Sequence, residues 1–168
     1  MPYHQKFIFA FGATILLAVS GMAQVANKKL TAQSFSGELM INAGPPAVWA
    51  AITDVQKLAS ALNFEYKGAP KKLERVGESV QMKVWGDAGT YILIHAKPGS
   101  ELRYVWEPDN ATYICQERWT LTPAGRGTKL VYEERYTESG PQTAAAIAEQ
   151  VKSYNQALAR VKAMCEAK

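Results

Sequence analysis

Hydrophobic and polar side chains alternate along most of the chain, as they do in strands that are buried on one face. Phe35, Leu39 and Ile41 share one side of the segment 35–42, and Ser, Glu and Asn occupy most of the other side. This two-residue period predicts a first strand. From residue 64 to residue 137, turn-forming residues separate six short runs rich in Val, Ile, Tyr, Trp and Thr, a pattern typical of antiparallel hairpins. The chain is therefore expected to form seven strands.

The segment between the first strand and the hairpins predicts two short helices. The Pro-Pro pair at 45–46 suits the first turn of a helix, where no backbone donor is lost. Asp54 can cap a second helix, which carries Val55, Leu58 and Leu62 on its apolar face.

After residues 139–141, Ser-Gly-Pro, the hydrophobic period becomes that of a helix. Apolar side chains recur every three or four residues, at Ile147, Val151, Tyr154, Leu158, Val161 and Cys165. Such a stripe needs a partner, and the concave face of the sheet is the only large surface available. We therefore predict an α+β domain over residues 35–168, in which a curved seven-stranded antiparallel sheet wraps one long C-terminal helix.

Three segments carry a resemblance to a known family. They are residues 41–58 (INAGPPAVWAAITDVQKL), 101–108 (ELRYVWEP) and 117–136 (ERWTLTPAGRGTKLVYEERY). With the order of the predicted elements, they resemble the helix-grip fold of the START-like (SRPBCC) superfamily, specifically its polyketide cyclase/dehydrase and Aha1-homology branch. The resemblance implies a central ligand-binding cavity, enzymatic activity in only some members, and partner-protein binding in the Aha1 branch.

The N-terminus has the layout of a secretory signal peptide over residues 1–23. Lys6 supplies a positive charge, residues 7–19 form an uncharged apolar run, and small residues precede a cleavage point after Ala23. The run is shorter than the roughly 20 residues of a spanning helix. We expect an exported protein, periplasmic or secreted, with a polar linker over residues 24–34 and no stable membrane insertion after cleavage. An uncleaved membrane anchor is the alternative.

The charge of the chain argues against a nucleic-acid partner. The formal net charge is +4, and it becomes +3 without residues 1–23, which contain one basic residue, Lys6, and no acidic one. Basic residues are scattered, and only Lys28-Lys29 and Lys71-Lys72 are adjacent pairs. No continuous stripe for a phosphate backbone results.

Cys115 and Cys165 are expected to remain free thiols, although an exported protein permits a disulfide. Cys115 should lie opposite Tyr136, near the start of the final helix. Cys165 lies about 24 residues into that helix, or about 36 Å along its axis. A disulfide needs Cα atoms within about 7 Å, so we predict two buried, unpaired cysteines.

Two carboxylates are predicted to face each other on the inner side of the last hairpin. A turn at residues 125–126 sets a register in which Trp119 lies opposite Tyr132 and Glu117 lies opposite Glu134. Their Cβ atoms would then be about 5 Å apart. If both side chains were dry, one would hold a proton or a cation would lie between them.

His95 and Leu102 are expected to extend this pair into a row across the sheet, with Leu102 beside Glu117. A histidine in line with Glu117 and Glu134 suggests acid/base chemistry. The favoured alternative places both carboxylates at a wet cavity mouth, where their pKa values would be ordinary. His95 also has an alternative role as a hydrogen-bonded structural residue.

Aromatic side chains are the candidate lining of a cavity. The candidate ligand-binding residues are Tyr91, Tyr104, Trp106, Trp119, Tyr132 and Tyr154, with Ile147 and Val151 on the final helix. Simple core packing is the alternative. No phosphate-binding loop, dinucleotide fingerprint, nucleophile elbow or zinc motif is present, so no cofactor and no metal is predicted.

These patterns favour binding or transport of a small hydrophobic ligand, lipid-like or aromatic. Two alternatives stay open: a polyketide cyclase/dehydrase-like enzyme that uses the cavity carboxylates, and a module that binds a partner protein.

Overall fold

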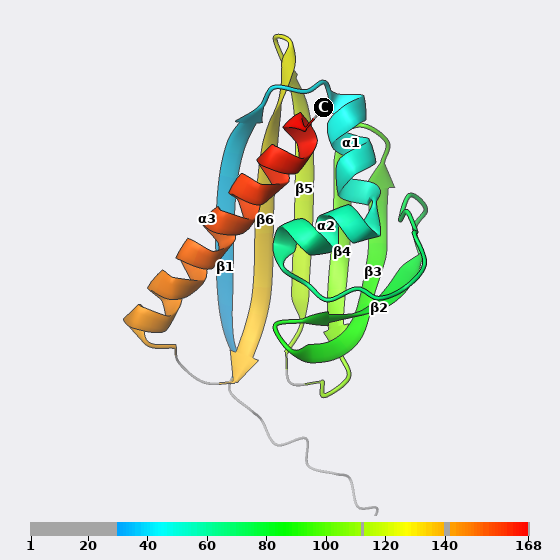
Figure 1. The fold of residues 1–168 in the computed structure, drawn as a ribbon. Helices are drawn as coiled ribbons and strands as arrows, with labels where there is room; N and C mark the ends of the chain where they lie inside the picture. The colour runs from blue at the N-terminus through cyan, green and yellow to red at the C-terminus, as the bar shows by residue number, and fades with distance from the viewer. Residues whose placement is uncertain (1–29, 112, 140–141, 168) are drawn as a thin grey trace, which may run out of the picture.

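The computed structural model describes residues 30–111, 113–139 and 142–167. A bent antiparallel sheet carries the long helix α3 diagonally across its concave side, and two short helices cover the remainder of that side (Figure 1). The strands are β1 (Leu30–Ile41), β2 (Ser79–Val84), β3 (Asp87–Lys97), β4 (Glu101–Pro108), β5 (Cys115–Ala124) and β6 (Gly127–Ser139), and the helices are α1 (Pro45–Thr53), α2 (Val55–Leu62) and α3 (Ala144–Glu166). The spatial order is β1-β6-β5-β4-β3-β2. The predicted α+β helix-grip arrangement is confirmed, with six strands instead of seven.

One of the six runs expected between residues 64 and 137 is 69–76, which lies between Gly68 and Gly77, and this run forms no strand. Its backbone instead joins the junction of α1 and α2: the Val55 amide donates to the Lys71 carbonyl over 2.9 Å, and the Leu73 amide donates to the Thr53 carbonyl over 3.0 Å. Leu73 is the single buried side chain of the run. The run has little apolar surface to bury as a strand. Its backbone is instead hydrogen-bonded to residues of α1 and α2.

The first strand begins earlier than predicted. Residues 30–34 pair with residues 135–139 of β6, so the expected linker over 24–34 is wrong in its last five residues. Backbone hydrogen bonds to β6 keep residues 30–34 in the sheet. The sequence of this part does not alternate between apolar and polar residues, so the pattern did not predict it. Residues 1–23, the predicted signal peptide, and residues 24–29 lie outside the described residues.

Capping residues mark where α2 begins and ends and where α3 begins. The Asp54 carboxylate accepts from the Lys57 amide over 3.1 Å at the start of α2, and Asn63, in the left-handed conformation at φ 62°, ends that helix. The Thr143 hydroxyl accepts from the Ala146 amide over 3.2 Å at the start of α3. Both predicted short helices and the long one are confirmed.

The predicted register of the β5–β6 hairpin is confirmed. Glu117 lies opposite Glu134, and Trp119 lies opposite Tyr132. Gly125 adopts φ 61° in the turn, a conformation that glycine reaches without a steric cost. The two carboxylates are therefore placed opposite each other by a turn that the sequence specifies.

The β4–β5 register differs from the prediction by two residues. Tyr104 lies opposite Glu117, and Leu102 lies opposite Trp119 instead of beside Glu117. The connection over residues 109–114 is longer than the tight turn that the sequence suggested. A slip of two residues keeps every side chain on its expected face.

His95 does not belong to the row of inward side chains. The β3–β4 register shifts between Leu93 and His95, and His95 pairs with Arg103. The imidazole is 45% exposed on the convex face, and its Nε2 lies 4.0 Å from the Glu101 carboxylate. The irregularity in β3 reverses the facing of the residues that follow it, so the expected acid/base role of His95 beside Glu117 is wrong.

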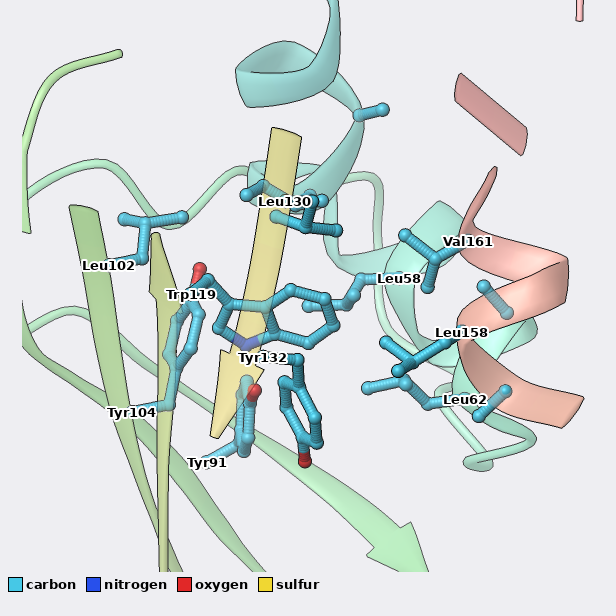
Figure 2. Close-up of a cluster of buried hydrophobic side chains, with 14 of the residues drawn as sticks. Leu58, Leu62, Tyr91, Leu102, Tyr104, Trp119, Leu130, Tyr132, Leu158 and Val161 are labelled. Atoms are coloured by element: carbon cyan, nitrogen blue, oxygen red, sulfur yellow. The ribbon is translucent and has the colours of Figure 1, made fainter. Parts of the chain in front are cut away.

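The core fills the space between the sheet and the helices. Trp119, which is fully buried, lies at its centre. Figure 2 shows Leu58 and Leu62 of α2, with Leu158 and Val161 of α3, approaching the Trp119 indole from the helix side. Side chains rather than empty space therefore occupy most of the hollow in the sheet.

The first half of α3 lies beyond the sheet. Tyr154 is the first buried residue of this helix, and Ile147 and Val151 are 38% and 40% exposed. Figure 1 shows the N-terminal end of α3 extending past β1. The expectation that Ile147 and Val151 line a cavity is therefore wrong, although Leu158, Val161 and Cys165 of the same stripe are buried.

Cys115 and Cys165 are buried and do not form a disulfide with each other, which confirms the prediction for the two thiols. In the part of the chain that the structure describes, no helix has the length and apolar character needed to cross a bilayer.

Candidate functional site

Two carboxylates lie inside the molecule, on neighbouring strands. Glu117 of β5 is 4% exposed and Glu134 of β6 is 3% exposed, and the two residues are direct cross-strand partners. Their predicted inward orientation is confirmed. The expectation of a wet cavity mouth is wrong, because helices and aromatic side chains cover both groups.

Neutral donors bind both carboxylates. Glu134 accepts the Tyr132 hydroxyl over 2.5 Å and the Tyr154 hydroxyl over 2.6 Å, one on each oxygen. Glu117 accepts the Tyr91 hydroxyl over 2.6 Å and the Trp119 indole N–H over 3.2 Å. The donors come from β3, β5, β6 and α3, so this network joins the sheet to the long helix.

Burial raises the pKa of both carboxyl groups. The pKa of Glu117 rises to about 8, first because it is buried and second because of the charge of Glu134, and the hydrogen bonds from Tyr91 and Trp119 oppose the shift. Burial also raises the pKa of Glu134, against the hydrogen bonds that it accepts. The pair therefore retains a proton at neutral pH.

The tyrosine hydroxyls around the pair remain protonated. Burial raises the pKa of Tyr91, Tyr132 and Tyr154, and the neighbouring carboxylates raise these pKa values further. These hydroxyls act as donors to the carboxylates over the whole physiological range of pH.

A groove opens beside the buried pair. It has a volume of about 270 Å³ and runs between the end of α2, the middle of α3 and the β2–β3 turn. Its lining residues are Leu62, Asn63, Phe64, Trp85, Tyr132, Ser153, Tyr154, Gln156, Ala157 and Arg160. Tyr132 and Tyr154 both line this groove and donate to Glu134, so two tyrosine side chains connect the groove with the carboxylate of Glu134.

The region between α1, α2 and the sheet is closely packed. A void of about 10 Å³ lies between α1, α2 and the sheet, against Tyr91 and Tyr104, which is room for about one water molecule. Tyr91 and Tyr104 stack at 4.5 Å between ring centroids, and Trp119 and Tyr132 lie 4.5 Å apart.

All six predicted aromatic residues are buried and belong to the core. Tyr132 and Tyr154 also line the groove, whereas Tyr91, Tyr104, Trp106 and Trp119 are not among its lining residues. Core packing therefore accounts for all six side chains, and two of them can also contact a molecule in the groove.

Trp85 is a groove residue that sequence analysis missed. It occupies the β2–β3 turn at φ 52°, followed by Gly86 at φ 96°, so both central residues of the turn are left-handed, as in a type I′ hairpin. A bulky residue is uncommon in this conformation. The indole is 51% exposed, and its ring centroid lies 5.9 Å from that of Tyr154. The signal in the sequence was a Trp-Gly pair between two strands, where Asn-Gly is usual.

Comparison with known proteins supports the architecture. The model of the family described as polyketide cyclase/dehydrase and lipid transport matches residues 32–166. No curated protein matches the chain. Among residues that the structure describes, no group of three or more His, Cys, Asp or Glu could hold a metal ion.

Several solved structures share the fold at low sequence identity. A protein from Chromobacterium violaceum is 22% identical at a TM-score of 0.59, and the match covers 80% of this chain and 98% of that one. The Aha1 protein from Colwellia psychrerythraea is 12% identical at a TM-score of 0.58, and the match covers 80% of this chain and 96% of that one. DynU16, a protein of the dynemicin biosynthetic locus, is 21% identical at 0.58, but the match covers 80% of this chain and only 47% of that chain.

Proposed function

We propose, from the premise that this chain belongs to the family of polyketide cyclases/dehydrases and lipid-transport proteins, that it binds a small apolar molecule in the groove between α2, α3 and the β2–β3 turn. The family assignment confirms the resemblance found in the sequence. The observation that carries the proposal is the groove of about 270 Å³, whose wall includes Leu62, Phe64, Trp85 and Tyr154.

The lining of the groove suits such a ligand. Small-molecule sites are mostly apolar and aromatic, with a few polar groups that fix orientation. Here Trp85 and Tyr154 offer ring surfaces, and Ser153 and Gln156 offer polar groups at the rim. The volume is slightly below the usual range of about 300–1,000 Å³ for drug-sized ligands, so the ligand is small or remains partly in solvent.

Binding of N-phenyl-1-naphthylamine, a neutral probe that fluoresces in apolar surroundings, tests the proposal. We expect saturable binding to the wild type, weakened at least fivefold by Trp85→Gly, which removes the aromatic wall and is compatible with the left-handed turn. Ile94→Ala serves as control, because Ile94 is 43% exposed on a different surface. No saturable binding, or an equal loss in both variants, would contradict the proposal.

The buried carboxylates favour a second candidate function, proton-transfer catalysis of the cyclase/dehydrase kind. Glu134 accepts hydrogen bonds from the Tyr132 and Tyr154 hydroxyls, and both residues line the groove. A proton could pass between a ligand in the groove and Glu134 through either hydroxyl, and Glu117 would set how readily Glu134 accepts it.

Exchange of the α-protons of α-tetralone with deuterated solvent, followed by NMR, tests the enzymatic candidate. If the chain catalyses this exchange, Glu134→Gln should abolish it while affinity for the neutral probe stays within twofold. Equal exchange rates with and without the protein would leave ligand binding as the function. The third possibility, a partner-binding module, stays an expectation from the sequence.

Export is part of the proposal, because the layout of residues 1–23 is that of a signal peptide. N-terminal sequencing of protein recovered from its native cells should then start near Gln24. A sequence that starts at Met1 or Pro2 would show that the segment is retained.

A further inference from the structure

Arg160 carries the only charge among the residues found to line the groove. The other polar residues of the rim, Asn63, Ser153 and Gln156, are neutral. Ser153, Gln156 and Arg160 are spaced at three and four residues along α3, so they lie on one side of the helix. A ligand in the groove would therefore meet a positive charge at one end of a polar rim.

The guanidinium of Arg160 is oriented but not neutralised. Its Nε donates to the Ala61 carbonyl over 2.6 Å, near the C-terminal end of α2, which is a common way to satisfy an open helix end. A guanidinium has five N–H groups, and this contact uses only the one on Nε.

Three other arginines of the chain differ from Arg160 in this respect. Arg75 pairs with Glu78, and Arg103 and Arg118 pair with Glu101. Over residues 30–111, 113–139 and 142–167, Arg160 has no carboxylate within ion-pair distance. Its outer nitrogens remain available for a planar anion, which arginine binds with two parallel hydrogen bonds.

The part of the groove formed by Tyr132 and Tyr154 disfavours an anion. The Tyr132 and Tyr154 hydroxyls already donate to Glu134, and Glu134 shares its surroundings with a second carboxyl group. A negative head group placed against these two hydroxyls would find their protons already donated to Glu134, and the charge of the carboxyl pair would repel it. The groove therefore differs in charge between Arg160 and the two tyrosines, which would orient a ligand.

We infer that the groove selects apolar molecules that carry a carboxylate, with the carboxylate on Arg160 and the apolar part against Trp85 and Tyr154. This inference rests on the proposed function, because it names the chemical class of ligand for the same groove.

Displacement of the neutral probe by decanoate and by decanol tests the inference, since the two competitors share a ten-carbon chain and differ in the charge of the head group. At pH 7.5 and low salt, decanoate should displace the probe from the wild type at a concentration at least threefold lower than decanol. Arg160→Gln should remove this preference and leave the affinity for decanol within twofold. Arg160→Lys should keep part of it, because the charge remains but the planar fork is lost.

Arg135→Gln is the matched control, because Arg135 lines a separate depression on the convex face of the sheet. This variant should leave the displacement of the probe by decanoate and by decanol unchanged. Wild-type preference for decanol, or a loss of decanol and decanoate binding together in Arg160→Gln, would overturn the inference while the binding proposal stands. If the probe, decanol and decanoate all fail to bind the wild type, both the inference and the binding proposal are wrong.

Discussion

Glu117 and Glu134 hold two acidic groups in apolar surroundings, where their protonation affects the stability of the fold. Both pKa values lie above the ordinary value of 4.5, that of Glu117 at about 8. The folded chain therefore binds more protons than the unfolded chain between these values. Stability contributed by the protonated pair is fully present below about pH 4.5 and is lost as the pH rises through about 8.

The free energy of unfolding should fall as the pH rises from 5 to 8, and it should fall less steeply in Glu117→Gln. Each proton released on unfolding contributes up to about 1.4 kcal/mol per pH unit. Urea unfolding at several pH values measures both slopes. Glu107→Gln, which changes an exposed acid on β4, should keep the wild-type slope. Parallel curves for the wild type and Glu117→Gln would show that Glu117 has an ordinary pKa.

The sequence could predict the direction of these side chains but not their depth. The turn at Gly125 fixes the register, and the register fixes that Glu117 and Glu134 face inward. Burial depends on Tyr154, which comes from α3 and donates to Glu134. Such a contact between distant segments leaves no local pattern. For the same reason the sequence did not identify Trp85, whose role depends on its position beside Tyr154.

At the scale of elements, α3 divides into a packed half and an exposed half. It crosses β1 at Gly37, where a Cβ atom would lie 2.6 Å from Cδ1 of Leu158. The absence of a side chain at Gly37 lets the helix approach the strand closely. Before Tyr154, the helix has no buried side chain.

Substitutions along α3 should therefore differ in cost. Leu158→Ala should lower the free energy of unfolding by about 2–5 kcal/mol, because it empties a packed site. Ile147→Ala and Val151→Ala should change it by less than about 0.5 kcal/mol, as exposed substitutions do. Chemical denaturation of the three variants checks this difference. A large loss of unfolding free energy in Ile147→Ala would mean that the first half of α3 is packed in solution.

Elements with a strong hydrophobic period were predictable, and irregular connections were not. The six strands follow from alternation, the two short helices from the proline pair and the Asp54 cap, and α3 from the helical stripe. The shift between Leu93 and His95 moved the histidine to the convex face, because β3 is apolar on both sides there and the pattern sets no register. The run 69–76 looked like a strand between two glycines, but its backbone bonds to helices.

At the scale of the whole molecule, the sheet and helices enclose a packed interior and leave a groove at its side. The void against Tyr91 and Tyr104 is about 10 Å³, whereas the groove between α2, α3 and the β2–β3 turn is about 270 Å³. A ligand can therefore occupy the groove without displacing Trp119 from the core. The central cavity that the family resemblance implied is replaced here by aromatic packing and an adjacent groove.

The four tryptophans provide the most direct test of where a ligand binds, because each indole N–H gives its own NMR signal. On titration with N-phenyl-1-naphthylamine, the Trp85 signal should shift most, since its ring lines the groove. The Trp106 signal should stay in place, because this residue is 1% exposed and donates to Tyr113 within the core. A dominant shift of Trp106, or no shift of Trp85 at saturation, would contradict binding in the groove.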